Sequence, residues 1–276
     1  MSESPLYEAF RGFSLALAAG LIALAFVESA VRHLVFDRPV QKRTITVNLG
    51  MWLVELVLRT ATGGWRWLVF AAASTLAPWQ LTMTPWGWGL LYVLVDGFYY
   101  ARHRLLHSTR IGWALHAPHH ASTDLSITSS LRLGWVQRVM DDFFYVPLVL
   151  LGMPPLAVFI AVELNHGSQL WCHTEIVGRL PFLDTFLNTP SNHRVHHARD
   201  RAFADSNYAA TFMLWDKLFG TYRREPEERL LLGWEEPYEG ANPFIIQFRE
   251  LYRLSEGAPR LPEQPASASA PPPPRR

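Results

Sequence analysis

The sequence predicts an all-α membrane protein with several helical spans and a histidine-rich site for two metals beside the ends of those spans. Three observations carry this prediction. Hydrophobic residues make up 49% of the 276 residues, and the mean hydropathy is +0.05. Many of them lie in long runs, and several of the eleven tryptophans stand at the ends of these runs, as at a membrane interface. Eight of the eleven histidines fall into three tight groups.

Charge and cysteine content exclude other classes of protein. The formal net charge of +1 gives no sign of a basic surface for nucleic acid. Cys172 is the only cysteine, so the chain has neither an internal disulfide nor a multi-cysteine zinc site. We expect this cysteine to be a small buried hydrophobe rather than a ligand.

The apolar runs set the predicted spans. Residues 13–31 are long enough to cross a bilayer core, and no basic segment or cleavage site makes them a signal peptide. Residues 45–58 and 65–79 are separated by Arg59 and the sequence TATGG, and a third run covers 86–100. The fourth, 143–164, has a Gly-Met-Pro-Pro break, which predicts either one kinked span or a helical hairpin.

Basic residues orient these spans. The loop after the first span should lie on the cytoplasmic side, because it contains Arg32, Arg38, Lys42 and Arg43. If 45–79 makes one net crossing, the span at 86–100 returns the histidines to that side; two crossings would put them outside. We favour one crossing through a discontinuous segment, because Glu55 and Arg59 are spaced to pair within it.

The first histidine group lies in the sequence DGFYYARHRLLH. His103 and His107 are four residues apart, so on a helix they share a face, and Asp96 falls on the same stripe. Metal-bound imidazoles usually donate their second N–H to a carboxylate or carbonyl, which makes Asp96 a candidate partner. The alternative is a salt bridge between Asp96 and Arg102 or Arg104.

The other two groups share the spacing H-x-x-H-H. They consist of His116, His119 and His120, and of His193, His196 and His197. On a helix the last two residues of each group point about 100° apart, so they could serve two different metals. Pro118 predicts that its helix begins nearby. Asn192 is expected to cap the helix of the third group or to contact its ligands.

Two further histidines follow the fourth apolar run. His166 and His173 are seven residues apart and would share a helix face, at a depth where ionisable groups are usually functional. Buried hydrogen-bonded histidines are the alternative for both. His33 stands alone and is expected on the surface.

The number of imidazoles requires two metals. Zinc takes four ligands and octahedral metals take six, so eight to ten imidazole nitrogens are more than one metal ion can bind. An isolated i,i+4 pair is also typical of surface histidines, but three groups beside predicted span ends favour metal binding. Iron, copper, zinc and nickel all accept imidazole, and spacing alone leaves the choice open.

These motifs resemble a known family. DGFYYARHRLLH, WALHAPHH, WCHTE and NHRVHH, within about residues 90–222, are similar to the fatty acid hydroxylase/sterol desaturase superfamily of integral-membrane di-iron oxygenases. HHASTDLSITSSLR, FLNTPSNHRVHH and LWDKLFGTY are most similar to its alkylglycerol monooxygenase branch. The chain departs from the family where Ala209 follows Tyr208, because a glycine is frequent there.

The resemblance implies a helical membrane domain whose cytoplasmic helical cap holds two iron ions. Carried over by position, the implied ligands are His103, His107, His116, His119, His120, His173, His193, His196 and His197, with His166 as a tenth. The implied activity is O₂-dependent hydroxylation of a C–H bond in a fatty acyl, alkyl ether or sterol-like lipid. Electrons would come from a separate protein or a diffusible reductant, with tetrahydrobiopterin implied by the branch, because no flavin or haem motif is visible.

The expected organisation is N-terminal transmembrane helices in 1–85, a catalytic domain in 86–225, an extension in 226–256 and a disordered Pro/Ala-rich tail in 257–276. A lipid desaturase with the same metals is the alternative within the class. From other classes, a histidine-rich metal transporter and a zinc hydrolase stay open. The sequence leaves the oligomeric state undetermined.

Overall fold

The structure is a computed structural model that describes residues 5–37, 42–200, 202–233 and 242–257. Within these ranges the regular elements are all helices, accompanied by two isolated β-bridges. The predicted all-α class is therefore confirmed for the described chain. The predicted disordered tail falls, from residue 258 onward, outside the described residues, as does Arg38.

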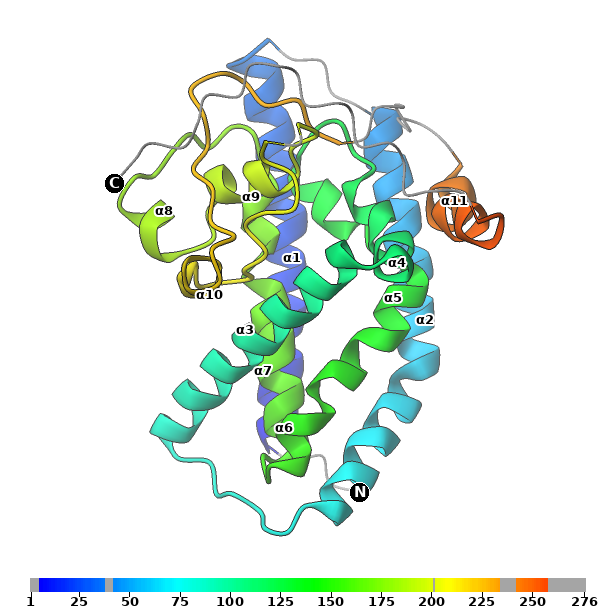
Figure 1. The fold of residues 1–276 in the computed structure, drawn as a ribbon, viewed down its shortest axis with the longest axis vertical. Helices are drawn as coiled ribbons and strands as arrows, with labels where there is room; N and C mark the ends of the chain where they lie inside the picture. Colours follow the sequence, from blue (N-terminus) through cyan, green and yellow to red (C-terminus); the bar gives the residue numbers. More distant parts are fainter. Residues whose placement is uncertain (1–4, 38–41, 201, 234–241, 258–276) are drawn as a thin grey trace.

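Long helices and one broken helical stretch pass between the two ends of the molecule (Figure 1). They are α1 (Pro5–Leu34), α2 (Lys42–Leu76), α3 (Pro85–Ser108), the succession α5 (Trp135–Met140), η2 (Asp141–Tyr145) and α6 (Val146–Leu150), and α7 (Pro155–Gly167).

Short elements gather around the upper end of this bundle in Figure 1. They are α4 (Arg110–His120), η1 (Ile127–Leu131), η3 (Leu170–Cys172), α8 (Leu183–Phe186), α9 (Pro190–His196) and α10 (Leu214–Leu218), with α11 (Pro243–Ser255) packed against α4. The histidine motifs are on α3, α4 and α9, so the bundle presents them at this end.

The second predicted span is one continuous helix, so its expected discontinuity is wrong. α2 runs through Gly63 and Gly64, each of which costs about 1 kcal/mol in a helix interior. Ion pairs hold the helix just before these glycines. The predicted contact between Arg59 and Glu55 is present at 4.0 Å, and Arg59 also pairs with Glu163 of α7 at 2.7 Å. Of these two contacts, the Arg59–Glu163 pair ties α2 to α7 close to the glycines.

The fourth predicted span is a helical hairpin rather than one kinked helix. α6 ends at Leu150, the chain turns through Gly152 at a φ of +91°, and α7 begins at Pro155 and packs back on α6. The turn follows from the sequence, because glycine adopts the left-handed backbone and proline cannot continue the preceding helix.

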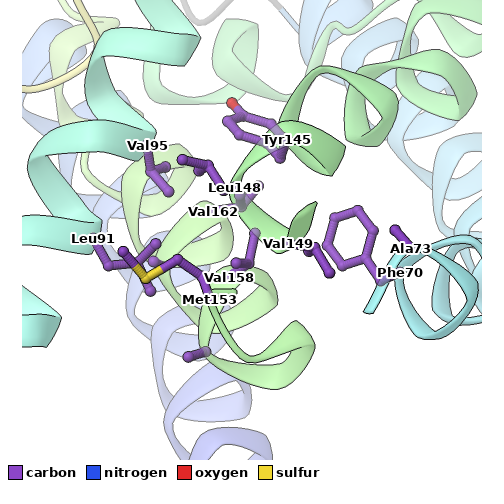
Figure 2. Close-up of a cluster of buried hydrophobic side chains, with 12 residues drawn as sticks. Phe70, Ala73, Leu91, Val95, Tyr145, Leu148, Val149, Met153, Val158 and Val162 are labelled. Carbon is purple, nitrogen blue, oxygen red and sulfur yellow. The ribbon is translucent and has the colours of Figure 1, made fainter. Parts of the chain in front are cut away.

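A buried apolar cluster joins α2, α3, α6 and α7 below the histidine end (Figure 2). Its members are Phe70, Ala73, Leu91, Val95, Tyr145, Leu148, Val149, Met153, Ala157, Val158, Ala161 and Val162. Because such interiors are close-packed, the cluster fixes the direction of α3 and therefore the position of the histidines in its last turns.

The basic end of α1 lies at the same end of the molecule as the histidine motifs. Arg32 Nη1 donates to the carbonyl oxygen of Leu125 at 3.0 Å, five residues after His120. This agrees with the predicted single passage of 45–79. Among the described residues, no helix combines the length and apolarity needed to cross a membrane. The side of a membrane on which the histidines lie stays a prediction.

Candidate metal centre

Nine of the ten candidate histidines meet in two adjacent groups, and all nine are buried. We call them group one and group two. Group one is His103, His107, His116, His120 and His196; group two is His119, His173, His193 and His197. Within each group the candidate ligand atoms all lie within 4.8 Å of one another.

A single residue brings the first two motifs together. Thr109 ends α3 and caps α4, where its hydroxyl accepts the Gly112 N–H at 3.1 Å, so α4 folds back against α3. α4 therefore begins at Arg110, and the start predicted near Pro118 is wrong. Pro118 lies in the last turn of α4, where it has no backbone N–H to donate to the carbonyl of Ala114, and the helix ends two residues later at His120.

Adjacent histidines divide between the two groups, as the helical geometry predicts. The rings of His119 and His120 are inclined by 88°, and those of His196 and His197 by 87°. One member of each pair faces group one and the other faces group two. His120 of group one and His197 of group two stack with ring centroids 4.3 Å apart, so the two groups are in direct contact.

Backbone carbonyls fix the tautomer of several rings. The Nδ1 atoms of His103, His119 and His196 lie 2.8, 3.1 and 2.9 Å from the carbonyl oxygens of Tyr208, Arg132 and Ser206. A carbonyl only accepts, so each Nδ1 carries the proton and each Nε2 keeps a bare lone pair. His173 Nδ1 faces the carbonyl of Gln169 at 3.2 Å in the same way.

These lone pairs point at one another. His103 Nε2 and His116 Nε2 are 3.0 Å apart, and His119 Nε2 and His173 Nε2 are 3.2 Å apart. His116 has the same tautomer, because its Nδ1 donates to Gln137 Oε1 at 2.9 Å. In addition, the buried Nε2 atom of His120 has no hydrogen-bond partner among the described residues. Facing lone pairs in a buried site repel unless a cation lies between them, so the arrangement fits a bound metal.

The imidazoles are also in the protonation state that ligation needs. Burial, the largest cause, lowers the pKa of His119 and His173 to about 3 and that of His196 to about 4. Burial likewise holds the pKa of His103, His116, His120, His193 and His197 well below the ordinary value of 6.5. These side chains are neutral at pH 7, and neutral imidazole suits iron, copper, zinc and nickel.

His166 lies outside both groups. Its Nδ1 is 3.3 Å from Arg138 Nη1, and its ring meets Tyr99 edge-on at 6.0 Å. The helix face predicted to unite it with His173 is wrong, because α7 ends at Gly167 and a 3₁₀ turn intervenes. His33 is exposed, as expected, and Cys172 is buried and belongs to neither group.

Asp96 lies on the predicted stripe but serves another purpose. Its carboxylate accepts from Asn165 Nδ2 at 2.7 Å, Thr211 N at 2.9 Å, Phe212 N at 3.1 Å and Trp215 Nε1 at 2.9 Å. It therefore ties α3 to residues 211–215. Arg102, one of the two arginines predicted as an alternative partner of Asp96, forms its salt bridge with Asp141 instead, at 2.5 Å.

The helix cap predicted at Asn192 is wrong. Thr189 caps α9, and its hydroxyl accepts the Asn192 N–H at 3.4 Å. The Asn192 side chain instead donates to the carbonyls of Asp184 and Leu187, at 2.8 and 2.9 Å. It anchors the start of α9 and so positions the histidines that follow.

Two contacts to the candidate ligands were not foreseen from the sequence. Gln137 of α5 accepts from His116 and donates from Nε2 to Asp141 Oδ2 at 3.3 Å. Asp205 Oδ1 is 3.1 Å from His107 Nδ1. No spacing relates either residue to its histidine, since 21 and 98 positions separate them.

Comparisons with known proteins show which family the chain is similar to. Residues 88–221 match the family model described as "Fatty acid hydroxylase". The chain is similar to alkylglycerol monooxygenase of Xenopus tropicalis, with 40% identity over 62% of this chain and 37% of the relative, and to that of Homo sapiens, with 38% identity over 64% and 39%. It is also similar to an ornithine lipid hydroxylase of Rhizobium tropici, with 32% identity over 49% and 41%.

The aligned part thus spans well under half the length of these relatives. No solved structure matches the chain.

Proposed function

We propose that the chain is an iron-dependent monooxygenase of the fatty acid hydroxylase family, whose model residues 88–221 match, and that it hydroxylates a C–H bond of a lipid. One observation carries the proposal. In each of two adjacent groups of buried imidazoles, bare Nε2 lone pairs face one another.

The donor set fits two iron ions. Five nitrogens in group one and four in group two leave open positions around octahedral iron, which oxygen chemistry requires. His103, His107, His116, His120 and His196 would hold one ion, and His119, His173, His193 and His197 the other. When bound, such ions supply the electrons and coordination positions for O₂ activation.

The protein's own groups would orient and shield the site. The carbonyls of Tyr208 and Ser206 hold His103 and His196 in the Nδ1–H tautomer. The Tyr208 ring packs edge-on against His103 and His196, at centroid distances of 5.7 and 5.9 Å. This covers group one on one side with an aromatic surface and limits the access of water.

The relatives point to the first substrates to test. By their names, they act on alkylglycerols and on an ornithine lipid. We take an alkylglycerol as the first candidate, with ornithine lipids, fatty acyl lipids and sterol-like lipids as further ones. The reductant would be a separate protein or tetrahydrobiopterin.

We also propose that the bundle lies in a membrane with the histidine end on the cytoplasmic side. Large apolar side chains are exposed on α1, α2 and α3, which supports a lipid environment. Arg32, in the last turn of α1, is at the histidine end, as the positive-inside rule would require of a cytoplasmic end.

The same contacts give less support to other functions. A zinc hydrolase would place a carboxylate base beside the metal, yet within the described parts of the chain both groups consist of histidines alone. A transporter would distribute ligands along the bundle, whereas these gather at one end. A desaturase would use the same metals and is distinguished by its product, which loses two hydrogens instead of gaining one oxygen.

Metal analysis and turnover test the proposal together. Protein from cells grown with ⁵⁷Fe should contain two irons per chain by elemental analysis and Mössbauer spectroscopy. The double variant His196→Ala/His197→Ala should lose them, and His33→Ala, at an exposed position, should not. With ¹⁸O₂, reductant and an alkylglycerol, the product should carry one labelled oxygen. A single zinc, or no metal after anaerobic handling, would sink the proposal.

A further inference from the structure

Helix α11 turns its apolar side outward and much of its polar side inward. Gln247 and Glu250 are buried against the protein. The large exposed side chains are Phe244, Ile245, Phe248 and Tyr252, of which Tyr252 is 63% exposed, while the rings of Phe244 and Phe248 also meet the buried Trp135 ring edge-on at 5.3 and 6.0 Å. This is the reverse of a helix that covers a protein in water, and an exposed apolar patch of this kind marks a contact surface.

Specific hydrogen bonds fix this orientation. Gln247 Oε1 accepts the backbone N–H of Trp135 at 2.8 Å, and its Nε2 donates to the Leu133 carbonyl at 2.7 Å. Ile246 packs into a buried cluster with residues of α2 and α4. The helix cannot rotate its aromatic residues inward without breaking these contacts.

Apolar side chains are exposed on other helices of the bundle as well. α11 packs against α2, on which Leu53, Leu56 and Val57 are exposed. α1 exposes Phe26 and Val27 as well. A protein partner covers one patch, whereas apolar side chains on several helices are what a surrounding lipid phase covers. Figure 1 shows α11 almost end-on beside the lengthwise α2, so α11 crosses the bundle direction.

We propose that α11 lies in the plane of a phospholipid membrane, with Phe244, Phe248 and Tyr252 inserted into the lipid. Amphipathic helices that lie in an interface bury such an apolar face in the boundary between head groups and acyl chains. Because α11 packs directly on α4, it holds the helix of His116, His119 and His120 next to the lipid. The inference deepens the proposed function and rests on it for the presence of lipid around the bundle.

The single cysteine makes a site-specific test practical. Cys172 is buried, so the unaltered protein should take up little label. Phe248→Cys, labelled with the environment-sensitive dye NBD, reports on the outward face of α11. Glu228→Cys, at an exposed position outside the helix, is the matched control. Both are reconstituted into phosphatidylcholine vesicles with and without doxyl-labelled phosphatidylcholine.

Lipid insertion predicts that NBD at position 248 emits further to the blue than at 228, loses most of its fluorescence to doxyl lipid and resists iodide. Quenching of position 248 by iodide to the same degree as 228 would overturn the inference. Resistance to both quenchers would also overturn it, because a second copy or another protein would then cover the face.

A kinetic measurement separates this inference from the proposed reaction. Phe244→Ser/Phe248→Ser should keep its iron content and its turnover of detergent-solubilised substrate. With vesicle-embedded substrate its apparent KM should rise severalfold at unchanged kcat. Leu231→Ser, which removes an exposed apolar side chain elsewhere, should change neither. An unchanged KM with vesicles would contradict a role of α11 in lipid contact, even if the hydroxylase activity itself is established.

Discussion

Replacing Gln137 by leucine removes the acceptor that holds the His116 proton on Nδ1, 2.9 Å away. The proton then favours Nε2, because the Nε2 lone pair of His103 lies 3.0 Å away and can accept it. That exchange blocks the atom that would bind the metal. Gln137→Leu should therefore weaken metal binding in group one and leave group two nearly unaffected.

The magnitude follows from the energy of one buried hydrogen bond. An unsatisfied buried donor costs about 1–3 kcal/mol, and each tenfold change in affinity corresponds to about 1.4 kcal/mol. The dissociation constant of the metal in group one should therefore rise about 10- to 100-fold, which is the usual effect of removing a hydrogen-bond partner from a metal ligand.

Anaerobic titration of the metal-free protein with ferrous iron measures this effect, and Mössbauer spectra of partly loaded samples show which site fills. Gln169→Leu is the matched control. It removes an amide of the same size but keeps the backbone carbonyl that His173 Nδ1 contacts at 3.2 Å. Equal affinities in wild type and Gln137→Leu, or an equal loss in both variants, would refute the reasoning.

Other expected outcomes rest on the same geometry. His196→Ala and His197→Ala should each lower the iron content and leave different residual Mössbauer spectra, since the two rings face different groups; identical spectra would contradict the division. Acid should destabilise the metal-free protein. Because burial holds several imidazole pKa values at about 3 or 4, the folded chain binds fewer protons than the unfolded chain below about pH 6.5. The free energy of unfolding from denaturant titrations should fall from that pH towards pH 4, by up to about 1.4 kcal/mol per pH unit for each such imidazole; stability that does not change with pH would argue against buried neutral histidines. Gly134→Ala should lower the melting temperature, because its Cβ would lie 2.0 Å from the Leu115 carbonyl oxygen, at a cost of at least about 1–3 kcal/mol. Gly178→Ala, with no atom of this kind within 4 Å, should melt like wild type, and equal melting of both variants would show that the backbone yields at Gly134.

The helical spacing of the histidines predicted which of them share a face. His103 and His107 share a face because they are one turn apart, and adjacent histidines diverge by about 100° on a helix. The shared face and the divergence of adjacent histidines depend only on local helix geometry, so both predictions hold wherever the chain is helical. The expectation for His166 and His173 failed because it assumed one helix across Gly167, where the chain in fact turns.

The hydrogen-bond partners of the candidate ligands could not be predicted from the sequence. Gln137 and Asp205 reach their histidines across 21 and 98 residues, and Asp96 is drawn to residues 211–215 instead of to an imidazole on its own stripe. Such choices depend on which surfaces meet after packing. Local spacing carries no information about them.

By itself, the sequence predicted the helical class, the resemblance to the fatty acid hydroxylase family and the nine histidines that meet in the two groups, because these depend on composition and short-range spacing. Only the tertiary structure decided how nine imidazoles divide into five and four, that His166 stands apart, and that α11 turns its aromatic face outward. The physical reason is that a helix fixes which side chains share a face, whereas long-range packing and buried hydrogen bonds fix what each face meets.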